Sequence, residues 1–138
     1  MADKLAFELV APERLLASLE VDMVVAPGAE GDFGVLPLHA PLVSLLRPGV
    51  IRVYEGDKVT KRVFVAGGFA EVNVRGLSIL AEEAEPVEEI DLEEARERLR
   101  NAEEDLADAR EPSEAERARL ERAVAVARAR VEAVENPV

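Results

Sequence analysis

The 138 residues are enough for one ordinary domain, or for one small domain with an appendage. A hydrophobic content of 49% excludes an intrinsically disordered chain, and no apolar run approaches the ~20 residues that cross a bilayer. The formal net charge of -12 argues against binding of nucleic acid, because phosphate backbones attract clustered lysine and arginine. The lack of cysteine excludes disulfides and thiolate metal sites. Residues 1–4 carry no basic flank before an apolar core, so we expect no secretion signal.

The first predicted strand covers residues 4–10, where Leu5, Phe7 and Leu9 alternate with polar or small residues. A period of two is typical of a half-buried strand. The chain then turns at a proline, and further extended segments are expected within residues 15–25.

The next stretch, residues 31–42, contains two glycines, two prolines and the only histidine of the chain, His39. Glycine permits backbone angles that a side chain forbids, and Pro37 and Pro41 fix their own φ and favour extended residues before them. The stretch therefore predicts a rigid, irregular corner between strands. A binding loop is the alternative that these residues leave open.

Short strands separated by turn signals dominate the following forty residues. The predicted strands are 42–46, 50–54, 59–66, 69–75 and 77–81. This pattern favours an antiparallel sandwich or barrel. We therefore predict a first domain at 1–85, an antiparallel β-sandwich long enough to bury its own core.

The period of the apolar residues changes after the acidic segment 82–89. This segment predicts a linker, and we place the linker between the domains at 86–90. Beyond it, within 91–138, apolar residues recur at intervals of three and four, which predicts helices with an apolar seam.

Each of the two predicted helices begins with a capping box. Asp91 is followed by Glu94, and Ser113 by Glu116, so each first side chain can accept a hydrogen bond from the third helical amide. A short loop between two helices predicts an antiparallel hairpin. The fold class expected is α+β in two parts, an N-terminal antiparallel β-sandwich followed by a C-terminal antiparallel two-helix hairpin.

The seam of this hairpin is weak. Its expected positions are Leu92, Ala95, Leu99, Ala102, Leu106 and Ala109 in the first helix, and Leu120, Val124, Ala127, Val131 and Val134 in the second. The large residues among them do not offset the entropy of ordering both helices. We therefore expect a mobile arm that leans on another surface and docks in more than one place.

The residue types in the sequence give little support to a catalytic function. A catalytic site needs a poised group in a pocket, and His39 in a proline-bracketed corner favours a structural histidine over a base. A metal site would rest on carboxylates alone. There is no G-x-x-x-x-G-K-[ST] phosphate loop, and Gly67-Gly68 does not open a helix as a dinucleotide fingerprint does. We expect no cofactor.

Three stretches together resemble the epsilon subunit of bacterial F-type ATP synthase. They are Gly31 to Gly49, which ends in Arg47-Pro48-Gly49; Gly67 to Glu82, which begins Gly67-Gly68-Phe69-Ala70-Glu71-Val72; and Asp91-Leu92-Glu93-Glu94-Ala95-Arg96. The resemblance covers nearly the whole chain and agrees with the order of sandwich, acidic linker and hairpin. One departure is Leu38, where the family usually has glycine or asparagine before the histidine.

The resemblance implies a non-catalytic rotor subunit in the central stalk of a proton-translocating synthase. In the family the sandwich binds the gamma subunit and rests on the membrane-embedded ring of c subunits. The chain would then lie at the cytoplasmic face of the bacterial inner membrane without inserting into it. The ring-contacting loop of the family matches Asp32, with Phe33 and His39 as further candidates.

The resemblance also implies a regulatory arm. In the family the arm folds on the sandwich or extends along gamma towards the catalytic alpha and beta subunits, where it blocks ATP hydrolysis and its basic residues meet the beta subunit. The arginines that could do so here are Arg98, Arg100, Arg117, Arg119, Arg122 and Arg128.

Some family members bind ATP through Ile-Asp, two residues and then Arg-Ala at the start of the first helix. Here Glu94 stands where that arginine would be, and a glutamate repels phosphate. ATP binding is therefore disfavoured, and Asp91 and Arg96 are the candidate residues that remain for it.

A protein of another class fits the same residues. It is a free-standing ligand-binding β-sandwich with a coiled-coil dimerisation arm. A stable homodimer through the hairpin would favour this alternative, whereas a monomer favours the rotor subunit.

Overall fold

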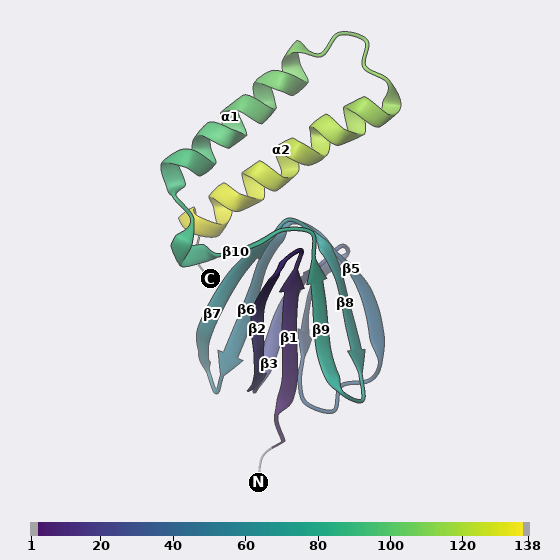
Figure 1. Ribbon diagram of the computed structural model, residues 1–138, viewed down its shortest axis with the longest axis vertical. Helices are drawn as coiled ribbons and strands as arrows, with labels where there is room; N and C mark the ends of the chain where they lie inside the picture. The colour runs from purple at the N-terminus through teal and green to yellow at the C-terminus, as the bar shows by residue number, and fades with distance from the viewer. Residues whose placement is uncertain (1–2, 137–138) are drawn as a thin grey trace. The chain divides into compact units, whose positions relative to one another are not determined.

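The computed structural model describes residues 3–136, which divide into two compact units (Figure 1). The first unit ends at Val87 and the second begins at Glu88. The strands of the first unit are β1 (Leu5–Ala11), β2 (Arg14–Val21), β3 (Met23–Gly28), β4 (Gly31–Val35), β5 (Leu42–Leu46), β6 (Gly49–Glu55), β7 (Lys58–Val65), β8 (Gly68–Asn73), β9 (Gly76–Ala81) and β10 (Ala84–Pro86). They are followed by the 3-10 helix η1 (Val87–Glu89) and by α1 (Leu92–Asp108) and α2 (Glu114–Glu135).

The strands form one continuous sheet that folds over on itself into two layers (Figure 1). The order of the strands is β10-β7-β6-β3-β5-β8-β9-β1-β2, and β4 pairs with β3 outside this path. The two layers join where Gly28 of β3 pairs with Leu46 of β5. The predicted fold class is confirmed, with one ladder of a different kind: β1 runs parallel to β9.

The core lies between the two layers. It consists of the inward side chains of alternate positions, for example Leu5, Phe7 and Leu9 of β1, each at most 3% exposed. The period of two predicted for residues 4–10 is therefore confirmed. Alternation continues in β8 and β9, where Ala70 and Ile79 pair and are both fully buried.

Two segments differ from the sequence-based prediction. Residues 31–35, predicted as part of an irregular corner, form β4, because Gly31 and Gly34 leave the backbone free to pair with β3. The segment 82–89, predicted as a linker, contains β10 and η1. β10 pairs with β7 at the edge of the sheet, where a proline such as Pro86 is tolerated and acidic side chains stay in solvent.

The second unit is a pair of antiparallel helices, as predicted (Figure 1). Both capping boxes are confirmed on the N-terminal side: Asp91 accepts from the Glu94 amide at 3.2 Å, and Ser113 accepts from the Glu116 amide at 3.1 Å. The predicted seam positions are all buried or half-buried. Among the described residues, neither helix is long and apolar enough to cross a membrane.

One half-buried carboxylate ties three segments of the sandwich together. Asp22, between β2 and β3, accepts a hydrogen bond from the Lys4 ammonium at 2.6 Å and another from the Gly56 amide at 2.6 Å. The ammonium of Lys4 also lies 3.6 Å from Glu55. The hydrogen bond from Lys4, and after it the one from Gly56, hold the pKa of Asp22 below its usual value.

We expect Asp22→Asn to reduce the loss in free energy of unfolding that the protein shows as the pH falls into the acid range. Because the folded-state pKa of Asp22 is lowered, its ionisation stabilises the fold above the ordinary carboxyl pKa, and that contribution is lost as the pH falls through the lowered pKa. The measurement is the free energy of unfolding from about pH 6 down to about pH 2. Asp57→Asn in the neighbouring turn is the control, and an identical profile for both variants would contradict the role of Asp22.

Candidate functional site

The turn between β3 and β4 is held by a small cluster of charges. The Arg47 guanidinium donates to the carboxylate of Asp32 and to the carbonyl of Gly28. Arg52 lies on the other side, with its Nη2 atom 3.5 Å from Asp32 Oδ2. The backbone amide of Arg47 also donates to Pro27 at 3.0 Å. Asp32 is therefore a carboxylate between two guanidinium groups.

Phe33 follows Asp32 in β4 and is half-buried against the core. Its ring lies directly over Gly28, where an added Cβ would be only 2.9 Å from Phe33 Cδ1. This close approach, together with the bonds of Arg47, fixes the shape of the turn. At its tip Glu30 is exposed and has no ion pair with any described residue.

His39 lies in the loop between β4 and β5, where its backbone amide donates to the Leu36 carbonyl at 3.2 Å. Because a carbonyl oxygen can only accept, His39 Nδ1 donates to Ala40 over 2.7 Å. Asp32 and Phe33 are neighbours in β4, and His39 is in the loop that follows this strand.

Leu38 in that loop has a φ of 64°, in the left-handed region, and its side chain is 87% exposed. Glycine and asparagine adopt this conformation at little cost, whereas leucine is strained by its Cβ. The backbone therefore holds Leu38 in a conformation that glycine or asparagine adopts more easily.

We expect Leu38→Asn to raise the free energy of unfolding by about 1 kcal/mol, because the strain is relieved and little buried surface is lost. Leu38→Gly should raise the free energy of unfolding by less, since glycine also increases the entropy of the unfolded chain. Urea unfolding measures the change. Leu36→Asn, at a nearby exposed position without a positive φ, is the control and should not stabilise.

The six arginines predicted for the arm are all exposed. Arg98 pairs with Glu94 at 2.7 Å, Arg117 with Glu121 at 3.9 Å, and Arg128 with Glu103 at 3.1 Å. Arg122 has an interaction partner as well. Arg100 and Arg119 have no ion pair with the described part of the chain.

The two residues considered for ATP both have structural partners. Asp91 caps α1. Arg96 reaches across to α2, where its Nη2 atom lies 2.7 Å from Glu135, and the hydrogen bond from Arg96 to Glu135 raises the pKa of the guanidinium. Either side chain would have to leave its partner to bind a phosphate.

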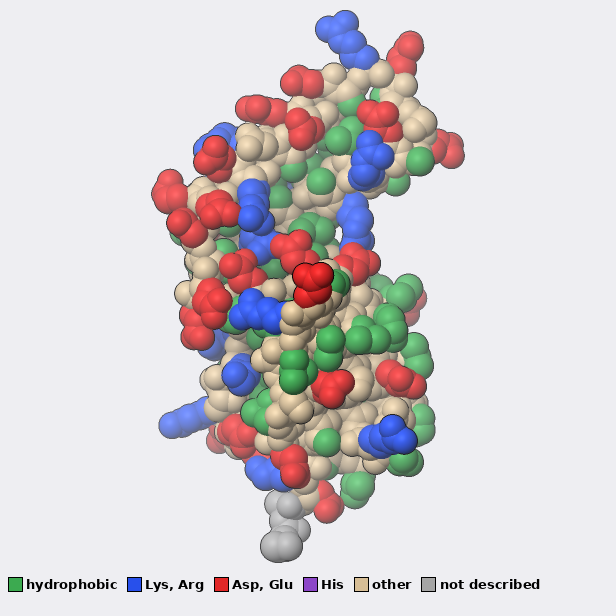
Figure 2. Space-filling model, in the orientation of Figure 1, with side chains coloured by type: hydrophobic (Ala, Val, Ile, Leu, Met, Phe, Trp, Pro, Cys, Tyr) green, Lys and Arg blue, Asp and Glu red, His purple; other side chains and the backbone are tan. Residues whose placement is uncertain are grey.

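The outer face of the layer β5-β8-β9-β1-β2 carries a row of apolar side chains that sequence reasoning did not assemble. The ladders place in register, strand by strand, Leu45, Phe69, Leu80, Val10 and Leu15. Leu45 is 70% exposed, and the other four are exposed or half-buried. We call these five residues the apolar row. Figure 2 shows hydrophobic side chains gathered on one side of the β-rich unit.

A groove adjoins one end of the apolar row. It lies between the β3–β4 turn and β5, encloses about 470 Å³, and is lined by residues that include Glu30, Phe33, Val43 and Leu45. Val43 and Leu45, both exposed, form one wall of the groove, and the β3–β4 turn with Glu30 forms the other. A clue was present in the sequence, because the segment 42–46 is apolar at positions of both faces.

Known proteins resemble this chain over most of its length. Residues 4–87 match the family model described as ATP synthase, Delta/Epsilon chain, beta-sandwich domain. The ATP synthase epsilon chain of Paramagnetospirillum magneticum is 54% identical over 97% of this chain and 99% of its own length. That of Rhodospirillum rubrum is 52% identical over 94% of this chain and 95% of its own.

Solved structures resemble the fold as well. A chain of the mitochondrial ATP synthase of Euglena gracilis, solved as OSCP/F1/c-ring, aligns with a TM-score of 0.75 at 30% identity, covering 91% of this chain and 78% of that one. A chain of the central stalk and c-ring of the Tetrahymena thermophila mitochondrial enzyme aligns with a TM-score of 0.64 at 16% identity, over 96% and 97% of the two chains. The second likeness concerns the fold alone.

Proposed function

The chain belongs to the family of ATP synthase delta and epsilon chains, and on this premise we propose that it is a non-catalytic rotor subunit of a proton-translocating F-type ATP synthase. Its task is to couple rotation of the c-ring to the gamma subunit. The observation that carries the proposal is the apolar row, which offers a partner a continuous surface on a rigid sandwich. The subunit works peripherally, at the cytoplasmic face of the bacterial inner membrane.

The gamma subunit is the partner that we assign to the apolar row. Exposed apolar side chains in register across a sheet lose water when a partner covers them, and this is the main source of affinity in protein interfaces. A sandwich is a stiff support for such a surface, because its two layers share one core. Because the sandwich is stiff, it can transmit torque from one partner to the other without bending.

The c-ring contact is assigned to the β3–β4 turn, with Asp32 and Phe33 as predicted and Glu30 added at its tip. Arg47 and Arg52 neutralise Asp32 within the layer, so Asp32 shapes the turn, and Glu30 is the acid free to meet a polar loop of the ring. His39, in the loop that follows β4, is proposed as a further contact with the ring.

Inhibition of ATP hydrolysis is assigned to the helical arm. Its exposed arginines would meet an acidic segment of the beta subunit when the arm is extended. Arg100 and Arg119 can do so at once. The other four, Arg98, Arg117, Arg122 and Arg128, must first exchange an intramolecular partner. Such exposed pairs are worth at most about 1 kcal/mol each, so exchange is inexpensive. ATP binding by Asp91 and Arg96 forms no part of the proposal.

The proposal is tested by adding the purified chain to a synthase core that contains gamma and lacks this subunit. We expect the chain to enter the complex in size-exclusion chromatography, and a chain that stays separate from gamma would refute the rotor assignment. The mass of the chain alone is measured in parallel. A stable homodimer through the hairpin would support the ligand-binding module with a dimerisation arm, whereas a monomer agrees with the rotor subunit.

The inhibitory role has its own test. ATPase activity of the assembled core is measured with the full chain and with a chain truncated before Asp91. A higher activity with the truncated chain would support inhibition by the arm. Equal activities would remove the inhibitory role and leave only coupling.

A further inference from the structure

The row of residues next to the apolar row is polar and acidic. The same ladders place in register Val43, Glu71, Ser78, Glu8 and Ser18. This second row lies two residues further along four of the strands, and three further along β2, where the ladder with β1 has a register shift. Neighbouring rows on one face of a sheet are two residues apart, about 7 Å. A partner that covers the apolar row therefore also faces the carboxylates of Glu8 and Glu71.

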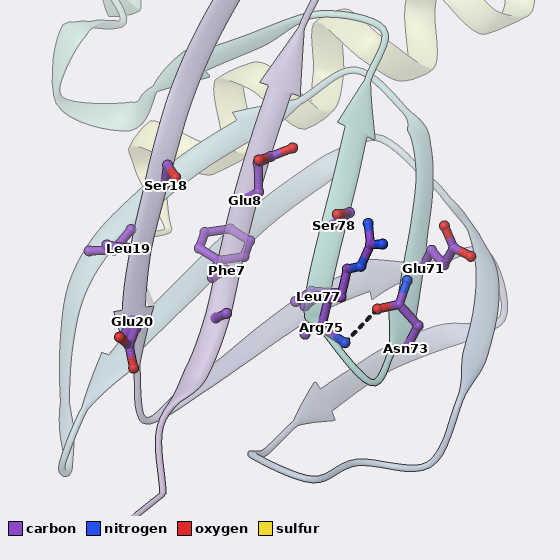
Figure 3. Close-up of a pocket in the computed structure, with 12 residues that line it drawn as sticks. Phe7, Glu8, Ser18, Leu19, Glu20, Glu71, Asn73, Arg75, Leu77 and Ser78 are labelled. Carbon is purple, nitrogen blue, oxygen red and sulfur yellow. Dashed lines mark hydrogen bonds between the residues drawn. The ribbon is translucent and has the colours of Figure 1, made fainter.

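These carboxylates line a concavity of about 690 Å³ (Figure 3). Glu20 of the edge strand β2 lines it as well, and Arg75, after β8, is the single basic residue of the lining. Figure 3 shows the lining residues on β2, β1, β9 and β8, and its dashed line is the hydrogen bond from the Arg75 amide to Asn73, 2.8 Å long. Acids outnumber bases three to one, so the surface attracts cations.

The acids of the concavity have no partners among residues 3–136. Glu8, Glu20 and Glu71 have neither a hydrogen bond nor an ion pair with any described residue, although elsewhere in the sandwich acids such as Asp22 and Asp32 are paired. A carboxylate that the fold does not use is available to a cation of a partner without the cost of breaking an existing bond.

The spacing of the two rows matches the spacing of a helix. Side chains of a cross-strand row repeat about every 4.8 Å, and a helix brings a side chain to one face every three or four residues, about every 5 Å. Five strands span about 19 Å, the length of a helix of about 13 residues. Glu71 on β8 and Glu8 on β1 are two strands apart, about 10 Å, which is the rise of seven helical residues.

We propose that this face receives an amphipathic helix of the gamma subunit that lies across the strands, with its apolar side chains on the apolar row and with lysine or arginine residues seven positions apart on one flank facing Glu8 and Glu71. The inference rests on the proposed function and adds to it the chemistry of the partner segment. The apolar row supplies affinity, and the two carboxylates fix the direction and register of the helix.

The test measures the affinity of the full chain for the synthase core that contains gamma and lacks this subunit, at two salt concentrations. Glu8→Gln with Glu71→Gln should weaken binding roughly tenfold at low salt, and should reduce the salt dependence that the wild type shows. Glu8→Lys with Glu71→Lys should weaken it further, because like charges then meet. The matched control is Asp3→Lys with Asp57→Lys, which changes the net charge equally on exposed acids outside this face.

The outcomes separate the two proposals. A wild-type chain that does not bind the core contradicts the rotor function itself. A wild-type chain that binds, together with a Glu8→Lys, Glu71→Lys variant that binds as tightly as the control, overturns the basic-flanked helix and leaves the rotor function standing. Circular dichroism establishes that the variants fold. Glutamate substitutions at the facing basic residues of gamma should restore binding of the lysine variant, which a merely structural effect would not produce.

Discussion

Gly68→Ala is expected to lower the free energy of unfolding by about 3 kcal/mol or more. Gly68 has a φ of 138°, a conformation that side chains rarely adopt, and it pairs with both Leu46 of β5 and Ala81 of β9. An added Cβ would lie 2.1 Å from the Leu80 carbonyl oxygen, which is backbone and cannot rotate away. The layer would have to separate at its centre to make room.

The control for this prediction is Gly56→Ala. Gly56 also has a positive φ, 62°, yet nothing lies within 4 Å of the position of its Cβ. Its substitution should lower the free energy of unfolding by only about 1 kcal/mol, because only the positive φ opposes the added side chain. Chemical denaturation of both variants measures the difference. A Gly68→Ala protein as stable as Gly56→Ala would contradict the close approach of β8 to β9 at Gly68.

Leu45→Asp is expected to weaken binding to the gamma-containing core about 100-fold, since it removes a large apolar contact and places a charge in a surface that loses its water. Leu45 pairs with Phe69 on the apolar row and is 70% exposed in the free chain, so the fold itself should be little affected. Calorimetric titration with the core measures the change.

Val74→Asp is the matched control for this second prediction. Val74 is fully exposed and lies in the turn between β8 and β9, outside the apolar row. Its substitution introduces the same charge and should change the affinity less than twofold. If Leu45→Asp binds as tightly as Val74→Asp, the apolar row is not the gamma-binding surface.

Local chemistry in the sequence predicted much of this fold. Asp91 and Ser113 start the two helices because a short side-chain acceptor meets a free amide there, and both bonds are present. Alternation in residues 4–10 gave the correct face of β1. β4 and β10 were missed, because a glycine-rich segment and an acidic segment have little strand propensity and pair only through a neighbouring strand.

The candidate site was less predictable, because its residues meet through tertiary structure. Arg47 is 15 residues from Asp32 in the chain, and no local sequence pattern predicts that they pair. The apolar row draws one residue from each of five strands, and it exists only because β1 pairs in parallel with β9. His39 was grouped with Asp32 by the resemblance alone, since it lies in the loop after β4 and no local pattern links the two residues.

ATP-driven proton pumping is the most direct test of the coupling role. Inverted membrane vesicles carrying the synthase are depleted of this subunit, so that ATP hydrolysis proceeds with little pumping, and the purified chain is then added back. We predict that the chain restores acidification of the vesicles per ATP hydrolysed, and that the Leu45→Asp variant does not. Acidification that is the same with and without the wild-type chain would contradict the assignment of this protein as the coupling element of the rotor.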